Sequence, residues 1–337
     1  MKPKTFFIAA ISIVVFVAVV IAGVYIYRNK TIVGAVLLDN PQMQFDIAEQ
    51  HYWSALCSVM YSGENNEEAL AKSKELREAV SWYKHAAGSY LIPQKDDYPP
   101  AQCALGYCWE SGYGVWKDPH EGGKWLNASR NGLINMAENG DMRAQYALGN
   151  YYLGFGTQER FDYKNMKKLL TDSAEAGYAP AQLMLCCFYA FTLFPDEDEI
   201  KLGRKWLRKA AEQEYAPAQF ILGICYSKGS AGIEKDENEA MVYFEKAAKQ
   251  DFAPAMLALG DCYKKGLGTE QDDWTAVEWY RKAANKECAM AEYMLGISYA
   301  EGRGVVRDEG NAVEWFLKAA DQGVEKAQKE LRKRDLY

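Results

Sequence analysis

The sequence contains very little histidine, three residues in 337. Histidine supplies many of the general bases and metal ligands of enzymes, so its scarcity argues against histidine-based catalytic or metal sites. The eight cysteines form no Cys-x-x-Cys pair and no cysteine–histidine set with zinc spacing. The nucleophile motif Gly-x-Ser-x-Gly is absent as well. We therefore expect a protein that is not an enzyme and that uses no cofactor or metal.

Basic residues are outnumbered, with 39 lysines and arginines against 46 acids and a net charge of −7. Four of the basic residues lie in the first 30 positions, where there is no acid, so the remaining chain has a net charge of −11. Such an acidic body argues against nucleic acid as a partner. Only ten prolines and 27 glycines are present, which excludes a collagen-like chain, and the 49% hydrophobic content excludes bulk disorder.

The first thirty residues have the pattern of a membrane segment. Residues 6–27 form an uncharged run of 22 residues with two lysines before it and Arg28 and Lys30 after it, and such a run is long enough to span a bilayer as one helix. The flanking charges favour an inside N-terminus and an exported, periplasmic body. The alternative is a signal peptide cleaved near Val20-Ile21-Ala22, which would leave a secreted protein.

The rest of the chain is a repeat array. An alanine opens each of seven similar segments, at spacings of 43, 37, 37, 37, 36 and 36 residues. A leucine follows each alanine after four residues, and in the first six segments an aromatic residue follows the leucine after four more. A fixed period of this length is typical of helical solenoids. The alanines are Ala101, Ala144, Ala181, Ala218, Ala255, Ala291 and Ala327.

Each unit is predicted to be a pair of antiparallel helices. Ala218, Leu222 and Tyr226 are spaced by four residues and share one face of the first helix. Gly229 suits the left-handed conformation that ends such a helix, and Asp236 suits the N-cap of the second helix. A glycine usually follows the core leucine, which lets the paired helices approach closely.

The clearest copy runs from Leu295-Gly296 through Tyr299, Gly302-Arg303-Gly304-Val305 and Asp308 to Trp315 and Lys318-Ala319-Ala320. This string resembles the Sel-one-like repeat (SLR) of the tetratricopeptide-like superfamily. The resemblance implies an all-α, right-handed superhelical solenoid of helix hairpins, here preceded by the transmembrane helix. It also implies a noncatalytic scaffold that binds a protein or peptide partner, often at a membrane or in the bacterial cell envelope.

The pattern divides the chain into five parts. Residues 1–30 are expected to be the anchor, 31–43 a linker, 44–100 a degenerate first repeat, 101–326 six Sel-one-like repeats and 327–337 a polar capping helix.

Two motifs admit a chemical interpretation. Gly-x-Gly pairs such as Gly302 and Gly304 could form phosphate loops, but they lack a preceding strand, so we interpret them as helix-cap glycines. The acidic run 196–199 could hold Ca²⁺, but it lacks the glycine and distal glutamate of a calcium loop. We expect it to be a solvated helix start.

An enzymatic alternative comes from the same resemblance. Some cysteine-rich relatives are associated with β-lactamase activity or with binding of peptidoglycan fragments, and their repeats are held together by paired cysteines. Alanines such as Ala211 and Ala218 stand at those places here, so we do not transfer that activity. Cys225 and Cys262 occupy equivalent places in adjacent repeats, and packed helices lie about 8–10 Å apart, so we expect no disulfide between them.

The partner is predicted to bind the inner surface formed by the first helices. Within each first helix, the residues two positions before the core leucine and the aromatic residue point away from the hairpin. By resemblance to tetratricopeptide arrays, this stripe lines the concave side and could receive an extended peptide or a helix. Its apolar and aromatic character suits an interface. The proposed groove residues are Tyr107, Tyr146, Asn150, Leu183, Phe220, Ile224, Leu257, Asp261, Tyr293 and Ile297.

Overall fold

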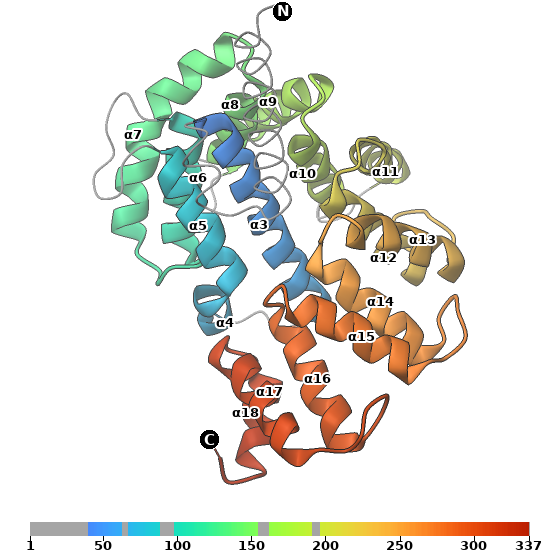
Figure 1. The fold of residues 1–337 in the computed structure, drawn as a ribbon. Coiled ribbons are helices and arrows are strands. Elements are labelled where there is room, and N and C mark those ends of the chain that lie inside the picture. Colours follow the sequence, from blue (N-terminus) through green and yellow to red (C-terminus); the bar gives the residue numbers. More distant parts are fainter. Residues whose placement is uncertain (1–39, 63–66, 88–97, 154–161, 191–195, 337) are drawn as a thin grey trace, which may run out of the picture.

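The computed structural model describes residues 40–62, 67–87, 98–153, 162–190 and 196–336. These residues form helices connected by turns, and none of them lies in a strand (Figure 1). Within these ranges no helix has the length and apolarity to cross a bilayer. The predicted anchor, residues 1–30, lies outside the described residues.

Six helix hairpins follow one another from residue 99 onward, as the repeat pattern predicts. Each consists of a first helix on the inside of the array and a second helix on the outside (Figure 1). The pairs are α6 (Pro99–Ser111) with α7 (Pro119–Glu138), α8 (Met142–Leu153) with α9 (Tyr163–Glu175), α10 (Ala179–Ala190) with α11 (Glu197–Glu212), α12 (Ala216–Lys228) with α13 (Glu237–Ala248), α14 (Ala253–Lys265) with α15 (Asp273–Ala284), and α16 (Ala289–Glu301) with α17 (Glu309–Asp321). A final helix, α18 (Glu325–Arg332), covers the end of the array.

The predicted helix ends are confirmed. Gly229 takes a left-handed conformation after α12, with its N–H bonded to the Cys225 carbonyl. The Asp236 side chain accepts hydrogen bonds from two backbone N–H groups at the start of α13. The acidic run is the start of α11, where Asp196 is the N-cap.

The second glycine of each Gly-x-Gly pair has a role that the sequence did not reveal. Gly304 has φ +68°, and a side chain there would overlap the backbone of Asp273 at the start of α15 in the preceding hairpin. Gly114 and Gly268 meet the preceding units in the same way. The first glycine of a pair therefore ends a helix, whereas the second lets one repeat contact the previous one.

The glutamine that follows the opening alanine also joins adjacent hairpins. The amide of Gln219 donates to the carbonyl of Ala211, eight residues earlier at the end of α11, and its own carbonyl accepts from Gln250. Gln182 makes the matching bond to Ala174. These side chains satisfy helix-terminal carbonyls that would otherwise be buried without a partner.

The segment before the six repeats forms a longer hairpin in which α3 (Pro41–Ser62) packs against α5 (Lys74–Ala86), with the short α4 (Glu67–Lys72) between them. Helix α3 begins inside the segment expected to be a linker. The Asn40 side chain accepts from the Met43 N–H and Pro41 occupies the first turn, so these two residues start the helix.

Helix α3 runs through the middle of the molecule, and the repeats curl around it (Figure 1). Besides α5, it contacts α12 and α14, which follow it by more than 150 residues. The two ends of the array also meet, because Lys74 Nζ lies 3.1 Å from Glu287 Oε1 and the Lys74 N–H donates to Gln322. The repeats therefore enclose α3 and close on themselves.

Candidate functional site: the inner surface and its cavity

The ten predicted groove residues all lie in first helices, and they form two groups by burial. Four are fully buried, namely Tyr146, Leu183, Phe220 and Leu257. Six are half-buried, namely Tyr107, Asn150, Ile224, Asp261, Tyr293 and Ile297. The inner surface is thus partly filled by the chain's own helix.

The C-terminal end of α3 closes tightly on the inner surface. The Tyr61 ring lies 5.8 Å from the Phe220 ring, centroid to centroid, and its hydroxyl donates to Asp261 Oδ2 at 3.0 Å. Tyr280 donates to the other oxygen of Asp261 at 2.7 Å. Phe220 also packs against two further rings, Phe244 and Phe252. This part of the groove has an intramolecular occupant.

The N-terminal end of α3 is fixed by an ion pair. Arg143 of α8 donates from Nε to Asp46 Oδ1 at 2.9 Å and from Nη2 to the other oxygen. Tyr178 donates to Asp46 as well, and the Arg143 guanidinium lies over the Tyr178 ring. This bidentate contact is the geometry in which arginine and a carboxylate interact most strongly.

One turn further along α3, Glu49 is buried without a cation. Its two oxygens accept from the hydroxyls of Tyr83 at 2.7 Å and Tyr146 at 2.9 Å, and its side chain is 4% exposed. Burial raises the pKa of Glu49 to about 7, although the two tyrosine hydrogen bonds act to lower it, and the nearby Asp46 raises it slightly more. The carboxyl group therefore titrates near neutral pH.

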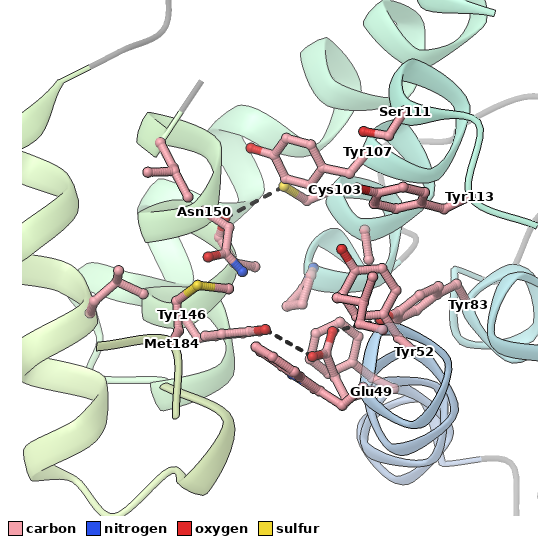
Figure 2. Close-up of a pocket in the computed structure, with 18 of the residues that line it drawn as sticks. Glu49, Tyr52, Tyr83, Cys103, Tyr107, Ser111, Tyr113, Tyr146, Asn150 and Met184 are labelled. Atoms are coloured by element: carbon pink, nitrogen blue, oxygen red, sulfur yellow. Dashed lines mark hydrogen bonds between the residues drawn. The ribbon is translucent and has the colours of Figure 1, made fainter. Parts of the chain in front are cut away.

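Beside Glu49 lies a cavity of about 500 Å³ between α3 and the inner faces of α6, α8 and α10 (Figure 2). The figure shows Glu49 at one edge and Tyr107 and Cys103 of α6 at the opposite edge. Three of the predicted groove residues line it: Tyr107, Tyr146 and Asn150. Phe220 and Ile224 do not, because they lie where α3 closes on the array.

The lining residues contributed by α3 and α5 were missed by the sequence analysis. The degenerate unit contributes Glu49, Tyr52, Trp53 and Tyr83. It lacks the repeat pattern from which the groove positions were counted. A usable signal was present nevertheless. The sequence of α3 has apolar and aromatic residues on all sides, and a helix of this kind is normally buried all round.

The remaining groove residues lie toward the C-terminal end. The Tyr293 ring lies 5.9 Å from Phe316 of α17, and Leu257 is in the main core. Ile224 and Ile297 are half-buried and pack against the same core. None of these contacts brings a reactive group to the inner surface.

The cysteines are all free, and seven of the eight are buried. Burial raises the pKa of Cys187, Cys262 and Cys288 to about 12, which keeps these thiols protonated and unreactive at neutral pH. Within the described part of the chain, no three histidine, cysteine, aspartate or glutamate residues are grouped so that they could hold a metal ion.

Helix pairs with this register are characteristic of a known family. The family model of the Sel1 repeat, the same repeat as the SLR above, matches six segments: residues 99–130, 143–168, 179–215, 216–252, 253–288 and 289–324. Among curated proteins, none matches the chain.

Solved structures with the same repeat are similar to it. A Sel1 repeat protein from Oxalobacter formigenes is 28% identical with a TM-score of 0.55, over 79% of this chain and 74% of that one. A protective antigen of uropathogenic Escherichia coli with an SLR fold is 27% identical with a TM-score of 0.49, over 85% of this chain and 57% of that one. The matched repeats cover more than half of the sequence, and the chain belongs to the Sel1 repeat family.

Proposed function

We propose that this protein is a membrane-anchored scaffold that binds a partner protein through the inner surface of its repeats, with the repeat body on the exported side of the membrane. Proteins of the Sel1 repeat family are generally noncatalytic and typically mediate protein–protein interactions. The anchoring part of the proposal rests on the uncharged run of residues 6–27 and its basic flanks.

The observation that carries the proposal is the packing of α3. The inner surface packs closely against the C-terminal end of α3, with the Tyr61 ring against the Phe220 ring and a hydrogen bond from Tyr61 to Asp261. This is the mode in which helical grooves bind partner helices. The inner surface of the repeats therefore has side chains suited to binding an apolar helix.

A partner has to bind beside α3 rather than in place of it. Removing α3 would expose the fully buried side chains of Phe45, Trp53 and Cys57 and would leave the Asp46 and Arg143 charges unpaired. The cost would reach many kcal/mol by the usual value per buried side chain. The six half-buried groove residues are thus the proposed contacts, with Ile224 and Ile297 as the apolar anchors.

Charge substitutions test the proposed surface. Tyr146 and Phe220 are unsuitable positions because they are 2% and 0% exposed, so a charge there would unfold the protein. The half-buried pair Ile224→Glu and Ile297→Glu is better, with Val242→Glu on α13 as the matched control because Val242 is 43% exposed. Full-length, tagged protein is purified from its native membrane fraction, and the co-purifying proteins are compared by mass spectrometry.

We expect the pair to lose a partner that both the wild type and Val242→Glu retain, with all three proteins showing the same helical circular dichroism. If the folded double variant retains every partner, the inner surface is not the binding site. Separately, protease added to spheroplasts, in which the outer membrane has been opened, should cleave the repeat body, and the purified protein should keep residues 1–30. Protection of the body or loss of those residues would contradict the anchored topology.

A further inference from the structure

The cavity beside Glu49 has the size and lining of a small-molecule site. Its volume of about 500 Å³ lies in the range of small-molecule sites. Of the twenty lining residues that the structure describes, eight are aromatic: Phe45, Tyr52, Trp53, Tyr83, Tyr107, Tyr113, Tyr146 and Phe188. A space of this size walled by rings is suited to the apolar body of an organic ligand.

The charge that the described residues place in this cavity has one sign. Among the lining residues that the structure describes, and apart from tyrosines and cysteines, Glu49 is the one ionisable group. Arg143 on α8 is paired with Asp46, on the preceding turn of α3. No cation of the described residues pairs with Glu49. The carboxyl group lines the cavity and accepts from two tyrosine hydroxyls, and the Trp53 side chain also acts to lower its pKa.

A carboxylate in this setting selects its ligand by charge. An ionised carboxylate accepts about four hydrogen bonds, and the two tyrosines use two of them. An ammonium group would supply both the missing donors and the missing positive charge. The surrounding ring faces attract cations as well, through the quadrupole of each ring. An anionic ligand would be repelled, and a neutral one would leave the charge uncompensated.

We infer that the cavity binds a small organic cation, an ammonium group on an apolar body, with the ammonium at Glu49 and the apolar part against α6 and α10. Tyr83 and Tyr146 hold the carboxylate in place, and Cys103, Met184 and Phe188 line the apolar end. The cavity shares Tyr107 and Asn150 with the proposed partner surface, but the apolar anchors of that surface, Ile224 and Ile297, do not line it.

Binding of a cation should be coupled to the proton of Glu49. The titratable groups that interact with Glu49 are Asp46 and Tyr52 on α3 itself, and Tyr83, Cys108, Tyr146, Tyr178 and Tyr215 on the packed elements. Burial raises the pKa of the six tyrosine and cysteine groups well above neutrality. Burial raises the pKa of Glu49 to about 7, so the affinity for an ammonium ligand should rise as the pH increases from 6 to 8.

Three probes with the same eight-carbon chain separate charge from apolar contact: octylammonium and octanoate, each below its critical micelle concentration, and 1-octanol below its solubility limit. Isothermal titration of the full-length protein in a nonionic detergent is repeated with Glu49→Gln and with the exposed control Glu138→Gln. We expect wild type and Glu138→Gln to bind octylammonium at least about tenfold more tightly than octanol, and octanoate most weakly. Glu49→Gln should keep octanol binding and lose the preference for the ammonium.

A second variant fixes the location. Ala104→Trp places an indole in the cavity from a half-buried position on α6, and it should abolish binding of octanol and octylammonium while the melting curve shows a folded protein. The inference is overturned if the wild type binds octylammonium no better than octanol or binds neither. It is also overturned if the preference survives in Glu49→Gln, or if Ala104→Trp binds as the wild type does.

Discussion

The two ends of α3 meet the same kind of surface in different ways. Its C-terminal end closes on α12 and α14 through the rings of Tyr61 and Phe220, whereas its N-terminal end leaves a cavity against α6, α8 and α10. The side chains at equivalent repeat positions account for the difference. Phe220 on α12 fills the space that Cys103 leaves open on α6. The repeat pattern thus sets the backbone of the array, and side chains at variable positions such as Cys103 and Phe220 contribute to whether the interior is filled.

The largest expected loss of stability is at the C-terminal end of α3, where it packs against α12. Phe220→Ala removes a fully buried ring that contacts three others, and it should lower the free energy of unfolding by about 3–5 kcal/mol. Met184→Ala, at a half-buried position on the cavity wall, should cost less than half as much because it enlarges an existing space. Urea denaturation measures both. Equal costs would show that the two halves are packed alike.

The next effect concerns the buried carboxyl groups of the α3–α5 hairpin. Burial raises the pKa of Glu75 to about 8, although the hydroxyls of Ser54 and Ser58 donate to it. Burial raises the pKa of Glu49 in the same way, to about 7. Between pH 4.5 and 8 the folded state therefore holds protons that the unfolded state has released. The free energy of unfolding should fall as the pH rises through this window, by on the order of 1–3 kcal/mol for Glu49 alone.

The variant Glu49→Gln with Glu75→Gln should flatten this pH dependence, since neither amide titrates. Thermal melting between pH 5 and 8.5 gives the comparison. A double variant whose Tm varies with pH as strongly as that of the wild type would assign the effect to other groups.

A smaller effect is expected at the last interface between repeats. Glu292 occupies the position of Gln219, and burial raises its pKa to about 7 although Gln322 donates to it. Glu292→Gln would keep that acceptor and add a donor for the Ala284 carbonyl, as Gln219 has for Ala211. It should stabilise the protein by about 1 kcal/mol at pH 8 and by less at pH 5. Destabilisation at pH 8 would mean that a glutamine at position 292 does not form the bond to the Ala284 carbonyl that Gln219 forms to Ala211.

The smallest effect tests the hydrogen bond at the closed end. Tyr61→Phe removes a donor to Asp261, but Tyr280 remains bonded to the other oxygen at 2.7 Å. The loss should be about 1 kcal/mol or less. A much larger loss in urea denaturation would show that the Tyr61 hydroxyl, more than its ring, holds α3 in place.

The hairpins could be predicted from the sequence because their determinants are local. A capping aspartate such as Asp236 and a terminal glycine such as Gly229 act within a few residues of their helix. The extra length of the first repeat also has a local outcome, the 20-residue helix α7. Repetition of the same signals at a fixed period made the register secure.

The position of α3 could not be predicted in this way. Its contacts join Tyr61 to Asp261 and Ser58 to the neighbourhood of Cys288, across 200 and 230 residues. No periodic pattern reports such contacts, because α3 occurs only once. The cavity is even harder to predict from the sequence, since it arises where the surface of α3 and the surface of the first helices do not fit together. The sequence did identify Tyr107, Tyr146 and Asn150 as inner residues, but not Glu49 as the charge beside them.

The closure of the array through Lys74, Glu287 and Gln322 has a mechanical consequence. An open solenoid stretches like a spring, since each repeat touches only its neighbours. In this protein α3 lies across the interior of the array, and Lys74 joins the first unit to the last hairpins. Extension therefore has to break the contacts of Asp46, Tyr61 and Lys74 together. The molecule should resist tension as a rigid frame. Force spectroscopy would then record one cooperative rupture before any repeat unravels.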